Sequence, residues 1–166
     1  MTLTSFQQGA ISGAWVPEPW ATRLVNEGGG KVLVDEKTLW PEGKYTTTVL
    51  LVKKSFLDKH AEVIQHLIEG LVTAVDLTKS NPTEAQKLTN EGIDKVTGKA
   101  LKPDLIAASF DHITFTEDPV ASSLQTSADN AKKLGFLDSS DLGQLFDLNI
   151  LNQVLKAKGQ PAVAST

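Results

Sequence analysis

The sequence contains no cysteine among its 166 residues. This absence excludes disulfide bonds, thiolate metal ligands and cysteine nucleophiles, although it does not fix the redox compartment. The histidines are few and scattered, and His60 and His66 are not spaced i, i+4 like a metal-binding pair on one helix. His66 lies beside an apolar helical stripe, and His112 is remote from both in the sequence. We therefore expect no metal site and no cofactor.

Long apolar runs and an excess of basic charge are also missing. No apolar stretch approaches the length of a membrane span, and the opening MTLTSFQQGA lacks the basic start and apolar core of a secretory signal. The net charge of -4 offers no global basic field, so we expect no nucleic-acid partner. The glycines at 28–30 follow an expected helix instead of opening one, which makes them a stop signal and not a phosphate loop. The length and the 40% apolar content fit an ordinary globular domain.

The first third of the chain alternates strand-like and helix-like patterns. Apolar, β-favouring runs occupy 11–16, 31–34 and 45–53. Between the first two, Pro19 suits the first turn of a helix that would end at the glycines. A loop with a WPEG turn fills 35–43. This alternation predicts an α/β fold class.

The remainder of the chain is predicted to be mainly helical. Its strongest signal is an apolar stripe within 61–79, which we expect to be buried. The safest core positions in that stripe are Val63, Ile64, Leu67, Leu71 and Val75. Further predicted elements are helices over 3–8, 55–60, 103–110, 120–134 and 148–158, a helix opened by a capping box at Thr83, a strand at 113–116 and a loose tail.

The stretch GAWVPEPWATRL holds two tryptophans, two prolines and one glutamate close together. One interpretation is structural: a buried strand, then a proline-started helix, with Trp15 and Trp20 in the core. The other is functional, because ligands in open α/β sheets bind where a strand ends and a helix begins. Two prolines would hold Glu18 in place, and flanking indoles suit the wall of a small-molecule cleft. The residues by themselves leave both interpretations open.

A family resemblance favours the functional interpretation. The segments GAWVPEPWATRLV, KVLVDE, LWPEGKY and TTTVLLV occur here in the order typical of periplasmic substrate-binding proteins of ABC transporters, in the aliphatic-sulfonate, taurine and nitrate group. NPTEAQKL, TFTEDPVASSLQTSADNAKKLGF and LFDLNILNQVL further along also resemble that group. The sulfonate branch fits best. One departure is Ser12, where the group usually has an aspartate before Gly13.

The resemblance implies a partial type II periplasmic-binding-protein fold, the second half of a two-lobed, doubly wound α/β architecture. Residues 1–44 would then finish the second lobe, and 45–54 would be the crossing hinge strand. Residues 55–160 would complete the first lobe, mainly as helices, and 161–166 would form a flexible tail. The resemblance also implies that the chain is a truncated half, without the first half or the signal peptide of the family.

The resemblance further implies which residues meet a ligand. Those expected to face the cleft or support its wall are Trp15, Glu18, Pro19 and Trp20, and those expected near the hinge are Thr46, Thr47 and Thr48. A sulfonate stays ionised near neutral pH, so it needs hydrogen-bond donors, and an indole can cover its alkyl chain. Glu18 repels a bare anion. It would fit if it paired with a basic group, accepted a hydrogen bond from a ligand amine as in taurine, or oriented a donor.

The implied function is solute capture for an ABC importer, with no enzymatic activity. The implied partners are a small organic anion, most simply an aliphatic sulfonate, and the ABC permease subunits, with a homo-oligomer through exposed sheet edges. The implied location is the periplasm or a cell-surface lipoprotein, in sulfur metabolism. Two alternatives stay open. One is a related pyrimidine-precursor protein or enzyme of thiamine biosynthesis, which would need a histidine or metal constellation that the sequence does not show. The other is a non-binding remnant that folds as an oligomer.

Overall fold

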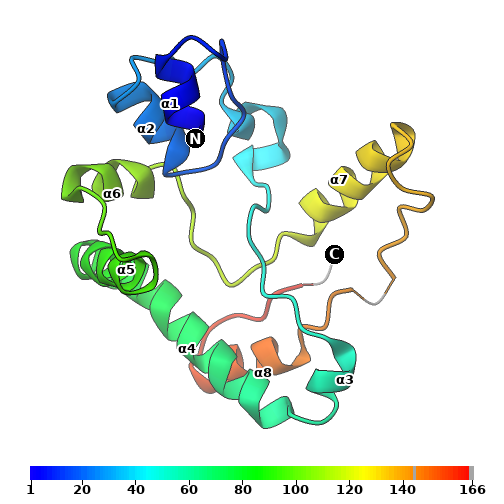
Figure 1. Ribbon diagram of the computed structural model, residues 1–166. Helices are drawn as coiled ribbons and strands as arrows, with labels where there is room; N and C mark the ends of the chain where they lie inside the picture. The colour runs from blue at the N-terminus through cyan, green and yellow to red at the C-terminus, as the bar shows by residue number, and fades with distance from the viewer. Residues whose placement is uncertain (144, 165–166) are drawn as a thin grey trace. The chain divides into compact units, whose positions relative to one another are not determined.

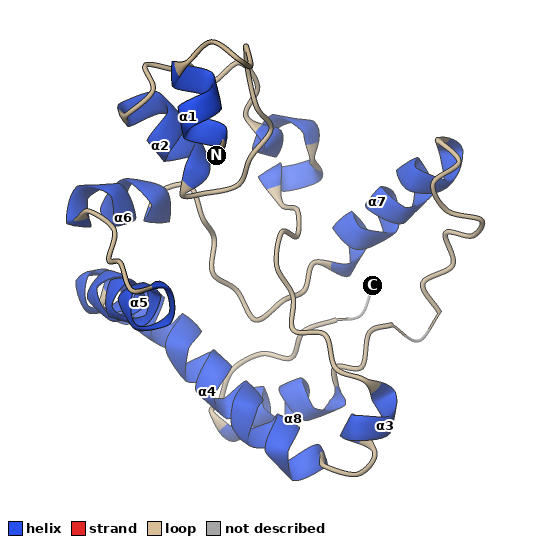
Figure 2. Ribbon diagram, viewed as in Figure 1, coloured by secondary structure: helices blue, strands red, loops and turns tan. Residues whose placement is uncertain are grey.

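The computed structural model describes residues 1–143 and 145–164, and within these residues the chain forms helices, turns and loops but no strand (Figures 1 and 2). The helices, with η marking 3-10 helices, are α1 (Thr2–Gln7), α2 (Trp20–Asn26), η1 (Glu36–Leu39), η2 (Pro41–Gly43), α3 (Lys54–Leu57), α4 (Ala61–Ser80), α5 (Pro82–Thr97), α6 (Pro103–Phe110), α7 (Ala121–Lys133) and α8 (Asn149–Ala157).

The predicted α/β class, as a partial type II periplasmic-binding-protein fold with a doubly wound sheet, is therefore wrong for this structure. The predicted strands 11–16, 31–34, 45–53 and 113–116 are all non-helical, but none is paired in a ladder. A β-favouring run becomes a strand only when a second run lies beside it and accepts its backbone hydrogen bonds. None of these runs has such a neighbour among the described residues, so the predicted sheet edges and crossing strand are absent there as well. Leu33, at 95% exposed, shows that this apolar run is not buried.

The chain divides into two compact units. The first comprises residues 1–35 and 76–115, and the second comprises 36–75 with the described residues from 116 onward. Helix α4 changes unit after Val75. The domain boundaries expected from the family resemblance stay predictions.

In the first unit, α1 and α2 pack together through a glycine at the end of α2. Helix α1 corresponds to the helix predicted over 3–8 and ends just before Gly9, which adopts a left-handed φ of 71°. A Cβ atom on Gly28 would lie 2.7 Å from the carbonyl oxygen of Leu24, and 3.1 and 3.2 Å from the side chains of Phe6 and Leu3. The contact with the backbone of Leu24 is shorter than real Cβ contacts, so the chain needs glycine at this turn. The side chains of Phe6 and Leu3 in α1 would also have to shift to admit a Cβ atom there.

Helix α5 of the same unit begins two residues earlier than predicted, with its cap at Asn81 instead of Thr83. Its N-cap is Asn81, whose side chain accepts a hydrogen bond from the backbone N–H of Glu84 at 3.2 Å, and Pro82 occupies the first helical position. The capping box predicted at Thr83 is therefore wrong. Asn81 satisfies the otherwise unpaired N–H, and proline costs nothing at that place. The helix ends at Gly98, which is left-handed with φ 73°.

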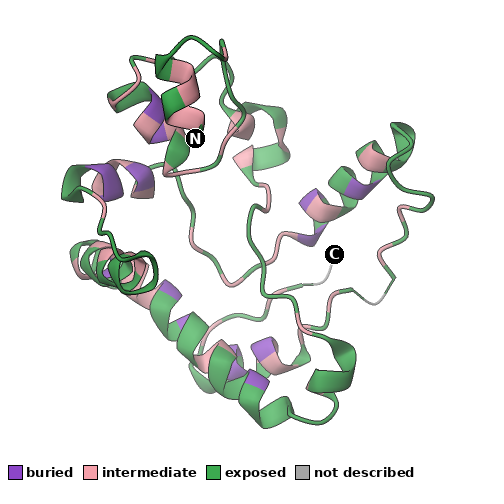
Figure 3. Cartoon of the chain, viewed as in Figure 1, coloured by how far each residue is buried: buried purple, intermediate pink, exposed green. Residues whose placement is uncertain are grey.

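The core of the second unit lies between α4 and α8. Its buried members are Val72, Leu151, Val154 and Leu155, with Ile68, Leu148, Ile150 and Val163 packed against them. Figure 3 shows buried positions along α4 and α8. Asn152 hydrogen-bonds both the N–H and the carbonyl of Val163, at 2.8 and 3.0 Å, so this part of the tail is held against α8 instead of being loose.

The apolar stripe of α4 is only half buried. Ile64 and Val75 are buried, as predicted, but Val63, Leu67 and Leu71 are 48%, 50% and 37% exposed, so their assignment to the core is wrong. On a helix, positions 64, 68, 72 and 75 form one ridge, and 63, 67 and 71 form the neighbouring ridge about 100° away. The cluster with α8 contains Ile68 and Val72 of the first ridge and no residue of the second.

Candidate ligand-binding site

The segment that precedes α2 forms a turn with both indoles largely at the surface. Trp15 is 71% exposed and Trp20 is 40% exposed. The carbonyl oxygen of Pro17 accepts hydrogen bonds from the N–H groups of Trp20 and Ala21, at 3.0 and 3.3 Å, which closes the chain into the helix. The Glu18–Pro19 peptide bond is cis. The arrangement contradicts the interpretation of both tryptophans as core, and it leaves aromatic surface accessible to a ligand.

Glu18 is half-buried and is turned toward the start of α2. Its Oε2 accepts a hydrogen bond from the backbone N–H of Thr22 at 3.2 Å. This bond satisfies one of the free N–H groups of the first helical turn, where a carboxylate is favoured. The carboxylate thus has a structural role, helix capping, that the three roles considered from the sequence did not include.

Sequence reasoning missed Arg23 on the same helix. Its guanidinium carbon lies 4.9 Å from the centroid of the Trp20 ring, a cation–π distance. Its Nε and Nη2 donate to Oε2 of Glu27, at 3.3 and 3.1 Å. The i, i+3 and i, i+4 spacings from Trp20 to Arg23 and from Arg23 to Glu27 were a usable signal, because such pairs meet on a helix surface.

The three predicted hinge threonines belong to the second unit. Thr46 is tied to the start of α7: its N–H donates to Oγ of Ser123 at 3.0 Å, and its Oγ1 donates to the carbonyl of Pro119 at 2.5 Å. Thr47 and Thr48 are exposed. The structure therefore anchors the first of the three threonines and leaves the other two at the surface, and their hinge role stays a prediction.

Next to Thr46, Lys44 and Glu42 form an exposed ion pair at 2.7 Å. The hydrogen bond and the opposite charge of Lys44 lower the pKa of Glu42, and those of Glu42 raise the pKa of Lys44. Both groups are exposed, so this pair contributes little to stability and offers no buried charge to a ligand.

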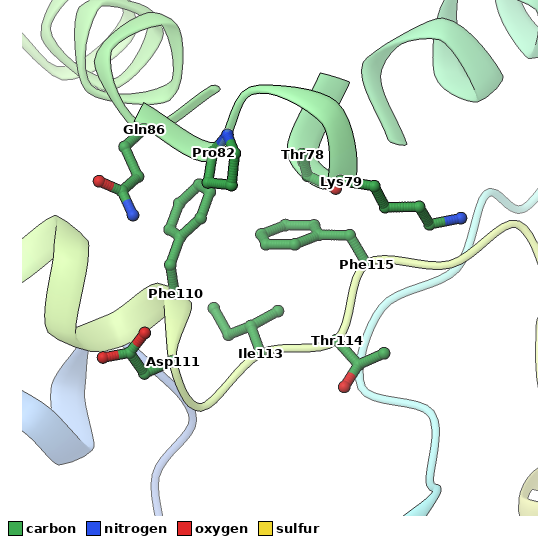
Figure 4. A pocket seen from close by; sticks show the side chains of 9 residues that line it. All are labelled: Thr78, Lys79, Pro82, Gln86, Phe110, Asp111, Ile113, Thr114 and Phe115. Carbon is green, nitrogen blue, oxygen red and sulfur yellow. The ribbon is translucent and has the colours of Figure 1, made fainter. Parts of the chain in front are cut away.

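An open pocket of about 380 Å³ lies elsewhere in the first unit (Figure 4). The rings of Phe110 and Phe115, with centroids 4.9 Å apart, line its middle, and the side chain of Lys79 extends away from them. The predicted binding residues do not line this pocket. It is therefore a feature separate from the turn that carries Trp15 and Trp20.

Metal-ligand clusters and membrane-spanning helices are both absent from the described residues. No group of three or more histidine, aspartate or glutamate side chains is close enough to hold a metal ion there. His60 instead packs against the ring of Phe56, with centroids 4.6 Å apart. None of the helices in the described part of the chain combines the length and apolar character needed to cross a bilayer.

Comparison with known proteins identifies the family of this chain. The profile of the NMT1-like family matches residues 1–91, more than half of the chain, and the chain belongs to this family. It is also 34% identical over 80 residues to the taurine-binding periplasmic protein of Escherichia coli (strain K12), a match that covers 48% of this chain and 24% of that protein. The chain thus spans about a quarter of the length of this relative.

These matches confirm the resemblance to substrate-binding proteins of the sulfonate and taurine group, over the matched part of the chain. No solved structure matches the chain. Trp15, Glu18, Trp20 and Arg23 all fall within the segment that the family profile covers.

Proposed function

We propose that this chain is part of a solute-binding protein of an ABC importer, and that its ligand is a small organic anion, most simply an aliphatic sulfonate. The observation that carries the proposal is the turn before α2, where two accessible indoles flank a short rigid segment inside the family-matched region. Such a surface suits the alkyl part of the ligand, because indoles present apolar area with a hydrogen-bond donor at one edge.

In this proposal Trp15, Pro19 and Trp20 contact the ligand, while Glu18 supports the wall by capping α2. The threonines at 46–48 are the proposed hinge. The solute-binding role places the protein in the periplasm, with the ABC permease subunits as partners and no chemical step of its own. A homo-oligomer is not part of the proposal, because it depended on sheet edges that the described residues do not form.

We expect the 166-residue chain to bind sulfonates weakly, with a dissociation constant of about 1 mM or weaker, which corresponds to about 4 kcal/mol or less. A sulfonate that rests against one aromatic wall keeps much of its hydration, so little free energy is gained.

The test is an NMR titration that follows the indole N–H signals of Trp15 and Trp20. Ethanesulfonate and taurine are the probes, and an alkylamine of equal length without the sulfonate is the matched control. Saturable shifts of these signals with both sulfonates, and not with the amine, are expected. Indole signals that do not move at sulfonate concentrations well above 1 mM would show that the turn is not a sulfonate site.

A further inference from the structure

Arg23 lies against the proposed ligand surface, and two contacts fix its position. Its guanidinium lies over the Trp20 ring at 4.9 Å, and one oxygen of Glu27 accepts from both Nε and Nη2. The side chains of Arg23 and Glu27 are 26% and 25% exposed. The guanidinium is thus partly desolvated and held in one orientation before any ligand arrives.

The guanidinium group of Arg23 has more N–H donors than its bonds to Glu27 use. A guanidinium carries five N–H donors, and the bonds to Glu27 use one on Nε and one on Nη2. Among the described residues no acceptor other than Glu27 engages the side chain of Arg23, so both donors of Nη1 are open to a second oxyanion. Guanidinium groups bind oxyanions through paired, charge-assisted hydrogen bonds, which a lysine cannot reproduce in the same geometry.

We propose that Arg23 is the group that binds the sulfonate in this site, and that Glu27 competes with the ligand for it. This inference rests on the proposed function, since it names the residue that meets the anionic end of the same ligand. The alkyl chain lies along the exposed part of the Trp20 indole, and the sulfonate oxygens accept from the guanidinium that the same indole positions. Glu27 lowers the affinity, because its carboxylate neutralises Arg23 and repels a second anion.

The experiment repeats the NMR titration with ethanesulfonate on the full chain and on substituted chains. Arg23→Gln removes both the guanidinium group and its charge. Arg23→Lys keeps the positive charge but lacks the paired N–H donors of the guanidinium. Glu27→Gln keeps the shape but removes the competing charge. Lys31→Gln is the matched control, since Lys31 is an exposed cation in the same unit. Far-UV circular dichroism of each variant verifies that the helices are retained.

We expect some substitutions to weaken ethanesulfonate binding and one to strengthen it. Arg23→Gln weakens ethanesulfonate binding by about tenfold or more, the effect of losing a charge-assisted hydrogen bond. Arg23→Lys recovers only part of that loss. Glu27→Gln tightens binding severalfold, a gain that misfolding does not produce, and Lys31→Gln changes it by less than about twofold, as screening of exposed charges predicts.

The outcomes separate the two proposals. If the unmodified chain responds to ethanesulfonate but Arg23→Gln and Glu27→Gln behave like Lys31→Gln, the role of Arg23 is refuted while the proposed function stands. If neither the unmodified chain nor Glu27→Gln responds, both are wrong. Tighter binding in Glu27→Gln combined with loss in Arg23→Gln supports both.

Discussion

Val72 is the most deeply buried side chain in the core between α4 and α8, and its truncation tests that core directly. Its exposed fraction is 0%, so Val72→Ala removes two methyl groups from a fully packed position. At about 0.8 kcal/mol per buried carbon the transfer cost is about 1.6 kcal/mol, and the cavity left behind adds up to about 1 kcal/mol. Alanine recovers about 0.5 kcal/mol through its higher helix propensity. The expected loss in the free energy of unfolding is therefore about 2 kcal/mol.

The matched control is Val63→Ala, which makes the same chemical change in the same helix at a position that is 48% exposed. Because about half of the Val63 side chain is already exposed, its truncation loses only about half of the free energy of burial. The higher helix propensity of alanine offsets most of that loss, so the expected change in the free energy of unfolding is within about 0.5 kcal/mol. A chain of this length loses about 2 to 4 °C of melting temperature per kcal/mol. Thermal melts followed at 222 nm should then show a drop of about 4 to 8 °C for Val72→Ala and little change for Val63→Ala.

Aspartate substitutions should enlarge the difference in stability between the buried and the exposed ridge of α4. Val72→Asp places an unpaired carboxylate in the core and should cost several kcal/mol, whereas Leu67→Asp places it on the outer ridge and should cost far less. Equal melting temperatures for the two alanine variants, or a larger loss for Leu67→Asp than for Val72→Asp, would mean that the buried ridge of α4 is assigned to the wrong side.

Two further predictions concern single hydrogen bonds. Asn81→Ala removes the side-chain acceptor that caps α5 and should lower the free energy of unfolding by about 1 kcal/mol, with Asn81→Ser as the control that keeps a cap; equal denaturant midpoints for the two variants would contradict the capping role. Thr46→Val removes the hydroxyl that donates to the carbonyl of Pro119 and should cost about 1 kcal/mol, with Thr47→Val as the exposed control; urea unfolding that shows no difference between these two would refute the anchoring of α7 by Thr46.

The helices of this protein follow from signals within a few residues of one another. The apolar spacing over 61–79 predicted α4, and the helices predicted over 103–110 and 3–8 correspond to α6 and α1. Such signals act through intrahelical hydrogen bonds and caps, which need no distant partner. The turn with Trp15, Glu18 and Trp20 was found in the same way, because prolines and indoles mark it locally.

Strand formation, by contrast, could not be decided from the runs themselves. The segments 31–34 and 45–53 have the composition of strands, yet a strand exists only through hydrogen bonds to a second segment, and none lies beside them in the described residues. The composition therefore predicted a sheet that residues 1–143 and 145–164 do not form.

Some features of the candidate site follow from the sequence, and others depend on the tertiary structure. The sequence by itself determined where the indoles, the prolines and Glu18 lie along the chain, the family to which they belong, and the helix that follows them. The contacts of Glu18 with Thr22 and of Arg23 with Trp20 and Glu27 span three or four residues, so they also lie within the reach of local signals. Only the tertiary structure decided that one ridge of α4 packs against α8 and that Thr46 is tied to the start of α7. The physical reason is range: helix signals act between neighbours in the chain, whereas burial and side-chain partners depend on which surfaces meet after the chain has folded.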